Sequence, residues 1–243
     1  WVRYEGEMLD RDSQTREVSV KLHWEPRSTM YHSGNHLDAW SVGLAMAEMP
    51  WSIQYFRDLK NQNQCRIEQG GRLSGTVMVD GEAEDLDLVG IRDHSWGRRD
   101  WAFISRYVWI LITLEKPVTL NSESFQYLCF TSVRYGTFSR LVSGWISGSN
   151  VVRPLVFGTG VKDIAEDGII PETFDVDCQA RGLEPVRLHF KRKNANAVSW
   201  MMNKNRFEVN EAFVDVSFQS SSSGVVGGIG MAEFGYNLEQ YPR

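Results

Sequence analysis

A dense group of charged and aromatic side chains lies in the segment Ile91-Arg-Asp-His-Ser-Trp-Gly-Arg-Arg-Asp-Trp101. Asp93 and His94 are adjacent and belong to the residue types that exchange protons with substrates in general acid–base catalysis. A carboxylate buried beside tryptophan rings such as Trp96 keeps its proton to higher pH than an exposed one, because burial disfavours the charged form. The segment therefore predicts a proton donor at Asp93, paired with His94, for a substrate with an alkene or a carbonyl.

The same segment also has a structural interpretation, in which its charged groups form a clamp that joins two β units. Neighbours on a strand point to opposite faces, so adjacency in the sequence does not by itself bring two side chains together. The catalytic and the structural interpretations both stay open at this point. The clamp would consist of Arg92, Asp93, Arg98 and Asp100.

Three histidines, His23, His32 and His36, lie close together in the segment from 22 to 40. A spacing of four residues, as between His32 and His36, can bind a metal ion when the segment is helical, but Gly34 and Asn35 between them favour a loop. We therefore expect binding-site contacts or ordinary hydrogen-bonded histidines here, and neither a metal ion nor another cofactor.

Aromatic residues are abundant, with 9 Trp, 8 Tyr and 12 Phe in 243 residues. A well-filled core most often explains such numbers, but closed barrels of this size commonly leave room for one extended or polycyclic apolar ligand. The sequence thus predicts an aromatic-lined cavity for a small hydrophobic ligand. The side chains expected to contact this ligand are Trp24, Met30, His32, His36, Trp40, Trp96, Trp101 and Trp109.

Composition and spacing disfavour several other classes of function. A formal net charge of -5, with Lys and Arg scattered along the chain, gives no basic stripe for nucleic acid. No apolar run approaches the roughly 20 residues of a membrane-spanning helix, so we expect a soluble protein. Residues 144–148 depart from the serine-hydrolase elbow, and Gly70-Gly71 lacks the Lys-Ser/Thr of a phosphate loop. The three cysteines do not have the spacing of a zinc site, and we expect all of them to be buried thiols: Cys65, Cys129 and Cys178.

Short alternations of apolar and polar residues recur along the chain and predict an all-β protein of antiparallel strands. Residues 72–79 and 83–88 flank Asp80-Gly81, a pair that favours a tight hairpin. The one convincing helical pattern covers residues 50–60, where Pro50 can open a helix whose apolar residues share a face. Further strands are expected at 18–24, 107–114, 125–133, 141–146, 173–180, 186–189, 207–216 and 230–236.

The clearest internal boundary lies near residue 100, where one series of strands ends and another begins. It predicts a first β unit over residues 1–100 and a second over residues 101–243. Because the segment from Trp1 onward already has the pattern of a strand, we expect the first unit to be incomplete at its N-terminal end.

Three segments of the chain resemble a known family. They look like the β domain found beside phosphoenolpyruvate-synthase-like phosphotransferase segments in many invertebrate proteins, and related bacterial domains carry a similar Asp-His-Ser-Trp-Gly-x-Arg-Asp-Trp block. More distantly, the Asp-His-x-Trp-Gly core is similar to that of lipocalin-like proteins that include carotenoid hydratases of the hydroxyneurosporene synthase type, plant tocopherol cyclases and fungal Diels–Alder cyclases. The segments are His23-Trp-Glu-Pro-Arg-Ser-Thr-Met-Tyr-His-Ser-Gly34, Arg66-Ile-Glu-Gln-Gly-Gly-Arg-Leu-Ser-Gly-Thr76 and Gly90-Ile-Arg-Asp-His-Ser-Trp-Gly-Arg-Arg-Asp-Trp101.

The resemblance covers nearly the whole chain and implies antiparallel lipocalin-like barrels, with two β units packed together and ligands of the isoprenoid or polyene type. It places Asp93, His94 and Trp96 at the turn that the distant enzymes share, with Asp93 as the candidate proton donor. The ATP-grasp and phosphohistidine parts of the phosphotransferase relatives are absent from this sequence, so no kinase activity is implied. Fold resemblance alone does not separate an enzyme from a carrier.

These observations support three hypotheses. The first is a lipocalin-like binding protein for a carotenoid, polyene or lipid. The alternative is an isoprenoid hydratase, cyclase or isomerase in which Asp93 protonates an alkene and Trp96, Trp101 or Trp109 stabilises the resulting cation. The third is a non-catalytic module of a larger phosphotransferase-like polypeptide. The residues leave open a cytoplasmic or secreted location, and a homo-oligomer, a hetero-oligomer or association with a missing N-terminal segment.

Overall fold

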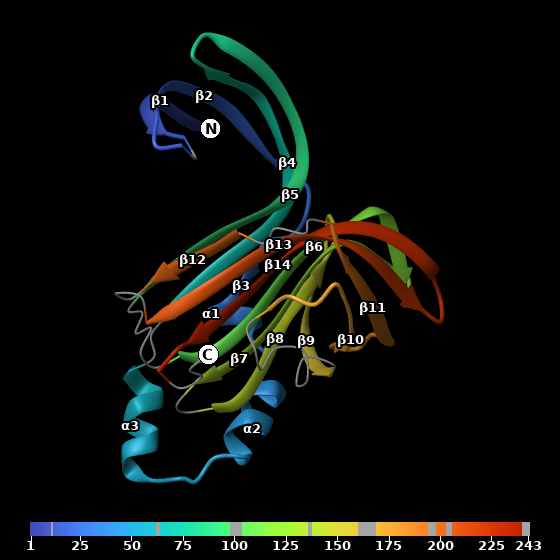
Figure 1. Ribbon diagram of the computed structural model, residues 1–243. Coiled ribbons are helices and arrows are strands. Elements are labelled where there is room, and N and C mark those ends of the chain that lie inside the picture. Colours follow the sequence, from blue (N-terminus) through green and yellow to red (C-terminus); the bar gives the residue numbers. More distant parts are fainter. Residues whose placement is uncertain are drawn as a thin grey trace.

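The computed structural model describes residues 1–10, 12–61, 64–97, 104–135, 138–159, 169–193, 198–202 and 206–239. In these residues the chain forms two antiparallel sheets, and three helices lie between strands of the first sheet (Figure 1). The all-β architecture predicted from the sequence is confirmed, including a closed antiparallel barrel.

The first sheet, called sheet A, has the strand order β1-β2-β4-β3, and β5 pairs with β4. The hairpin predicted around Asp80-Gly81 is confirmed, since these two residues join β4 to β5 with φ angles of 50° and 85°. Glycine adopts a positive φ without steric penalty, which suits the second position of this turn. The strands are β1 (Val2–Leu9), β2 (Thr15–Pro26), β3 (Tyr31–His32), β4 (Gln64–Val79) and β5 (Glu82–Gly97).

The second sheet, called sheet B, runs in the order β11-β10-β9-β8-β7-β6-β14-β13-β12. The long strand β13 pairs with β12 along its first half and with β11 along its second half, which closes eight of the strands into a barrel. The strands are β6 (Ile104–Leu120), β7 (Glu123–Tyr135), β8 (Phe138–Ser147), β9 (Val152–Thr159), β10 (Thr173–Ala180), β11 (Pro185–Arg192), β12 (Val198–Met202), β13 (Phe207–Ser220) and β14 (Gly224–Asn237).

The barrel follows from strict alternation along its strands. In β11 the side chains of Val186, Leu188 and Phe190 are buried, whereas the polar residues between them are exposed. Because successive side chains of a strand point to opposite faces, such a sequence buries one apolar face inside the barrel. Apolar side chains from all eight barrel strands pack there, and the rings of Phe174 and Phe190 stack 4.6 Å apart.

The helices are α1 (Ser33–His36), α2 (Ala39–Ala47) and α3 (Ile53–Asn61), and none in the described part of the chain is long and apolar enough to cross a membrane. The helix predicted over 50–60 is present, although it starts at Ile53. The loop expected around Gly34 is wrong, since one helical turn closes there through the Leu37 N–H to the Ser33 carbonyl. Helix α2 was not predicted, because its segment is apolar on every side and shows no 3.6-residue contrast.

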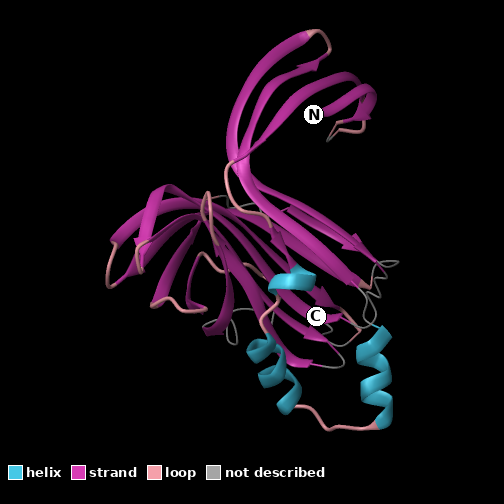
Figure 2. Ribbon diagram, turned by 180° about the vertical axis from the view of Figure 1, so that it is seen from behind, coloured by secondary structure: helices cyan, strands magenta, loops and turns pink. Residues whose placement is uncertain are grey.

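Asp38 caps α2 by accepting the Trp40 N–H at 2.8 Å, and the Arg181 guanidinium of the barrel bonds the same carboxylate. The helix is therefore fixed to the barrel wall, where the Ser41 hydroxyl also donates to the Leu155 carbonyl at 3.2 Å. Helices α2 and α3 form a helical hairpin that projects from one end of the molecule (Figure 2).

Sheet A meets the barrel along the first half of β4 and the second half of β5, and through Tyr31 of β3, which packs on Trp145, while its other half arches away with β1 and β2 (Figures 1 and 2). The contact needs a residue without a side chain at Gly70. A Cβ added to Gly70 would lie 2.2 Å from the Tyr127 ring of β7, so the ring packs directly on the backbone of β4.

Candidate functional site

The predicted chemical residues of β5 are distributed over both faces of sheet A. In the ladder with β4, Asp93 pairs with Glu68, and His94 pairs with Ile67. Alternate residues of a strand share a face. Asp93 therefore faces the barrel and His94 faces away from it, so the structure does not bring these two neighbours together as an acid–base pair.

On the face toward the barrel, the carboxylate of Glu68 is almost completely buried, with 2% of the residue exposed. It accepts hydrogen bonds from two tryptophans of the barrel, at 2.5 Å from Trp145 Nε1 and 3.1 Å from Trp109 Nε1. The Cys129 thiol lies 3.7 Å from the same carboxylate. Burial raises the pKa of the Glu68 carboxyl, and nearby Arg66 and the Trp145 hydrogen bond only partly offset that effect.

Arg66 is the cation at the centre of this region. Its guanidinium lies 3.6 Å from Glu68 Oε1 and 3.3 Å from Asp93 Oδ1, and stands 4.8 Å over the ring of Trp109. A guanidinium can pair with carboxylates along its edge while its face stacks on an aromatic ring. The group of Arg66, Glu68, Asp93 and Trp109, called the junction cluster, thus joins sheet A to the barrel.

A second pair of carboxyl groups extends the junction cluster along the barrel wall. Glu233 of β14 accepts a hydrogen bond from the Tyr107 hydroxyl and lies opposite Glu211 of β13 in the ladder. Burial and the bond with Glu211 raise the pKa of Glu233 to about 7, against the opposing effects of Tyr107 and Arg66. A carboxyl group with this pKa is about half protonated at neutral pH, so it can both donate and accept a proton.

The opposite face of the same strands carries a different group. Cys65 Sγ lies 3.7 Å from His32 Nε2, and the ring of Trp96 lies 6.2 Å from that of His32 and 5.5 Å from that of His94. His32 Nδ1 accepts the Gly34 N–H at 3.1 Å, and its Nε2 faces the thiol. Cys65 is partly exposed, unlike Cys129 and Cys178, so the expectation of buried thiols is wrong for Cys65.

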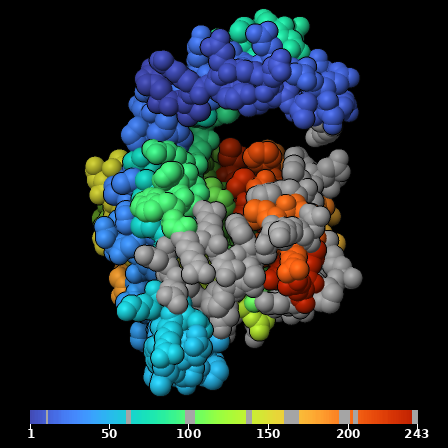
Figure 3. Space-filling model, turned by 90° about the vertical axis from the view of Figure 1, so that its left-hand side faces the viewer, coloured from blue at the N-terminus to red at the C-terminus, as the bar shows by residue number. Residues whose placement is uncertain are grey.

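The face that carries Cys65 and Trp96 continues into the arch of sheet A and is called the concave face. Alternation along the strands places mainly apolar side chains on it, several of which are exposed to solvent, such as Leu88 at 50% and Trp96 at 45%. A hollow of about 530 Å³ lies at the first hairpin of the arch, lined by Tyr4 and Val20 of this face and by four residues of the opposite face, Trp1, Arg3, Glu5 and Lys21. Figure 3 shows the N-terminal strands standing over the C-terminal strands with open space between them. The apolar residues of the concave face include Val18, Val20, Leu22, Trp24, Ile67, Leu73, Val77, Leu86, Leu88 and Trp96.

The remaining predicted residues are dispersed. Trp24 and His32 lie on the concave face with Trp96, whereas Trp109 belongs to the junction cluster. His36 accepts the backbone N–H of His32 through Nδ1 at 2.9 Å, and burial lowers its pKa. Arg92 lies on the concave face, so the expected clamp partner of Asp93 is replaced by Arg66. Met30 lies in the loop before β3 and Trp40 lies on α2, so neither belongs to a face of sheet A. Arg98, Asp100 and Trp101 fall outside the described residues.

Sequence reasoning missed the central residues of the junction cluster. Arg66 and Glu68 belong to a segment that carries the family resemblance, but neither they nor Trp145 and Glu233 were predicted as site residues. Apart from the pair on β4 itself, their partners lie on other strands, 22 or more residues away in the sequence. Among the described residues, no group of three or more His, Cys, Asp or Glu side chains is arranged to hold a metal ion.

Comparisons with known proteins agree with this fold. Residues 2–237 match the model of a family described as a domain of unknown function, DUF7064. No curated protein matches the chain. Among solved structures, an AttH-like protein from Nitrosomonas europaea is similar with a TM-score of 0.54 and 11% identity, over 98% of this chain and 68% of that one. At this identity the similarity shows the fold alone, and it is consistent with a lipocalin-like barrel. The phosphotransferase-associated and carotenoid-hydratase relatives remain predictions.

Proposed function

The chain belongs to the DUF7064 family, and we propose that it is a lipocalin-like module that binds a small apolar ligand on the concave face of sheet A. The ligand classes that fit are a polyene, a carotenoid or another lipid. The proposal keeps the hydrophobic ligand expected from the sequence but moves it from the interior of the barrel to the arch beside it.

One contrast carries this proposal. Among the described residues, apolar side chains pack together inside the barrel, and those of Ile110, Phe130 and Leu188 have no exposed surface. The concave face is also apolar, yet Leu88 and Trp96 are about half exposed. A contiguous exposed apolar surface marks an interaction site, and concave surfaces of this kind suit small apolar molecules.

The chemistry of the concave face favours an elongated ligand. Aliphatic residues line the arch, and the rings of Trp24 and Trp96 lie on the same face, so a flat conjugated chain can stack on them. Arg92 and His94 share that face and provide charged or hydrogen-bonding groups for a polar end.

The test combines extraction with titration. The protein is purified from its natural source and extracted with organic solvent for mass spectrometry, and the recombinant chain is titrated with the fluorescent polyene cis-parinaric acid. Leu88→Glu places a charge on the concave face and is expected to weaken binding by about tenfold or more, because apolar contact cannot compensate a desolvated carboxylate. Val225→Glu, at an exposed apolar residue of the barrel, is the matched control and should bind like the wild type.

Equal affinity of the wild type and Leu88→Glu would refute the concave face as the binding surface. A clean extract together with no binding of the polyene would instead favour the non-catalytic module of a larger polypeptide.

A second candidate function, proton transfer to an unsaturated ligand, is favoured by the carboxyl pair of Glu211 and Glu233. Asp93, the proton donor expected from the sequence, is held in an ion pair with Arg66, whereas Glu233 has a pKa of about 7. Turnover of isoprenoid substrates should then be lost in Glu233→Gln and kept in Asp93→Asn. Loss of turnover in Asp93→Asn alone would support Asp93 as the proton donor, as expected from the sequence. Unchanged turnover in both variants would exclude both Asp93 and Glu233 as proton donors.

A further inference from the structure

The helical hairpin α2–α3 presents an unusual surface. Helix α2 has the sequence Ala-Trp-Ser-Val-Gly-Leu-Ala-Met-Ala and contains no charged residue. It buries Ser41 and Ala45 against the barrel, but Trp40 and Leu44 on its other side are 63% and 45% exposed. A helix on the surface of a globular protein normally carries polar residues on its outer side, so this apolar side is adapted to a different environment.

Helix α3 adds a second apolar face with positive charge at its edge. At 100° per residue, Ile53, Phe56, Arg57 and Lys60 lie on one side of the helix, and all four are exposed. Tyr55 and Leu59 lie on the inner side. Among the described residues, neither Arg57 nor Lys60 has an ion-pair partner.

The acidic residues of the hairpin lie elsewhere. Asp58 is on the other side of α3, where it accepts a hydrogen bond from Gln54 Nε2 at 2.8 Å. Glu48 lies at the C-terminal end of α2. Positive charge therefore accompanies the apolar residues of α3 on its exposed face.

Trp51 completes this surface between the two helices. The residue is 65% exposed, while its Nε1 donates to the Met46 carbonyl at 2.9 Å, so the polar atom is used internally and the ring is left for apolar contact. The hairpin projects beyond the barrel, away from the arch of sheet A, so the surface is accessible to a large flat partner (Figures 1 and 3).

We propose that the helical hairpin α2–α3 docks onto a membrane surface that contains anionic lipids. Trp40, Leu44, Trp51, Ile53 and Phe56 enter the boundary between headgroups and acyl chains, and Arg57 and Lys60 contact lipid phosphates. Tryptophan rings and basic residues beside an apolar helix face are typical of interfacial helices. Nine residues of α-helix are about 14 Å long, so each helix lies on the bilayer without crossing it. This proposal is independent of the ligand proposed for the concave face.

Sedimentation with vesicles tests the proposal on the full chain. The vesicles are made of phosphatidylcholine alone or of phosphatidylcholine with phosphatidylserine. The double variant Trp40→Ser/Leu44→Ser should lower binding to the mixed vesicles by about tenfold, since apolar area is the main contribution to insertion. Arg57→Gln/Lys60→Gln should lower binding to the mixed vesicles by about tenfold and leave binding to phosphatidylcholine nearly unchanged.

Matched controls come from the barrel. Phe213→Ser/Val225→Ser removes two equally exposed apolar side chains, and Lys116→Gln/Lys191→Gln removes two exposed charges. Both should bind vesicles like the wild type. Circular dichroism of every variant should show an intact fold, because all of the substituted side chains are exposed.

Absence of vesicle binding by the wild type would overturn the proposal, as would an equal loss in the barrel controls. A dimer in analytical ultracentrifugation that is abolished by Trp40→Ser/Leu44→Ser, without vesicle binding, would also overturn it and would identify the hairpin as an interface between copies of this chain.

Discussion

The carboxyl groups around Arg66 carry more negative charge than one guanidinium can neutralise. Glu68 and Asp93 lie within 4 Å of it, and Glu233 is also affected by its charge. An unpaired buried charge is costly, so such groups retain protons instead. This agrees with the raised pKa values of both Glu68 and Glu233.

At the scale of single residues, Glu233 should make stability depend on pH. Its pKa is raised from 4.5 to about 7 on folding, so between these values the folded state binds more protons than the unfolded state. The stabilising contribution is then complete below pH 4.5 and is lost as pH rises through 7. As pH rises through this range, the free energy of unfolding of the wild type should fall by about 2–3 kcal/mol relative to that of Glu233→Gln, whose side chain stays neutral. Urea unfolding at several pH values measures this difference.

The exposed Glu115→Gln variant is the control for this measurement and should follow the wild-type pH dependence. Glu68 contributes in the same direction in all three proteins, so only the difference between variants is assigned to Glu233. Parallel curves for the wild type and Glu233→Gln would contradict the prediction.

The sequence directed attention to β5, but the side chains that meet there are not the neighbours in the sequence. Asp93 lies on the face toward the barrel, where it pairs with Arg66, whereas His94 and Trp96 lie next to each other on the opposite face. The strand conformation separates adjacent residues by face, and their true partners belong to other strands. No local pattern in the sequence contains that information.

At the scale of elements, β4 packs on the barrel, and at Gly70 its backbone lies directly against the Tyr127 ring. A Cβ at Gly70 would meet the base of the Tyr127 ring, which cannot move away without shifting β7. Gly70→Ala should therefore lower the free energy of unfolding by about 1–3 kcal/mol, as overpacking does elsewhere. Urea denaturation monitored by tryptophan fluorescence measures it.

Gly90→Ala on the neighbouring strand is the matched substitution. A Cβ at Gly90 meets no atom within 4 Å, so its stability should stay within about 1 kcal/mol of the wild type. Equal effects of the two substitutions would show that the close packing of β4 on Tyr127 is not what fixes sheet A to the barrel.

Most elements with clear periodicity were predictable, and the irregular ones were not. The strand expected at 173–180 coincides with β10, and every other expected strand lies within an observed one. Strand β9 was missed because Pro154 and Gly158 interrupt its pattern, and β3 because two residues carry no periodicity. Helix α2 is stabilised by its contact with β8 and β9 and by the Asp38–Arg181 ion pair. Neither interaction is between residues close in the sequence, so no local pattern predicts the helix.

At the scale of the whole molecule, the division near residue 100 predicts that the second half of the chain folds by itself and that the first half does not. Every buried residue of the barrel core lies between Val108 and Tyr236. Sheet A buries few apolar side chains of its own, among them Val18 and Leu22. We therefore expect a fragment of residues 101–243 to unfold cooperatively on heating, and a fragment of residues 1–100 to lack fixed tertiary structure by near-ultraviolet circular dichroism.

The full chain is the reference for both fragments. An unfolded 101–243 fragment beside a cooperatively folded full chain would contradict the division, and would mean that sheet A and the barrel fold as one unit.

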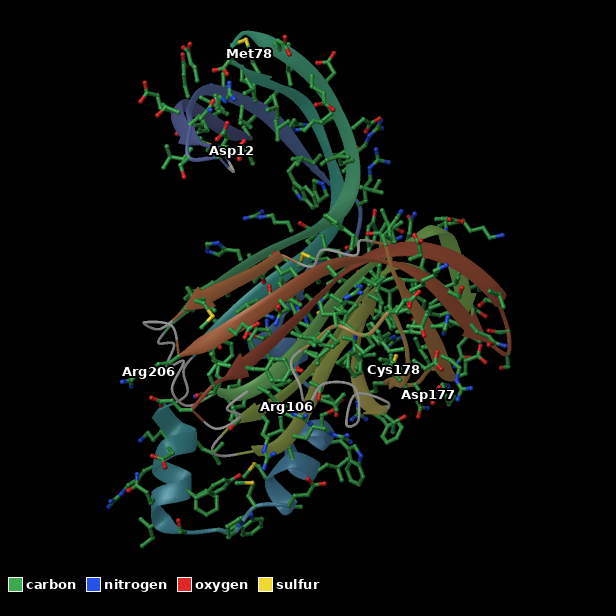
Figure 4. All side chains as sticks on the ribbon, in the orientation of Figure 1. Asp12, Met78, Arg106, Asp177, Cys178 and Arg206 are labelled. Atoms are coloured by element: carbon green, nitrogen blue, oxygen red, sulfur yellow. The ribbon has the colours of Figure 1, made fainter. Side chains whose placement is uncertain are left out.

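The sequence by itself determined the all-β class, the tight hairpin at Asp80-Gly81 and most strand positions (Figure 4). Alternation of side chains and turn chemistry are local properties, so a single segment suffices to show them. Only the tertiary structure decided that the described apolar side chains of the barrel pack in its interior, that an exposed apolar face lies beside it, and that Arg66 lies close to Glu68 and Asp93. Those outcomes depend on strand register and on contacts between residues tens of positions apart, and such contacts leave no periodic signal in the chain.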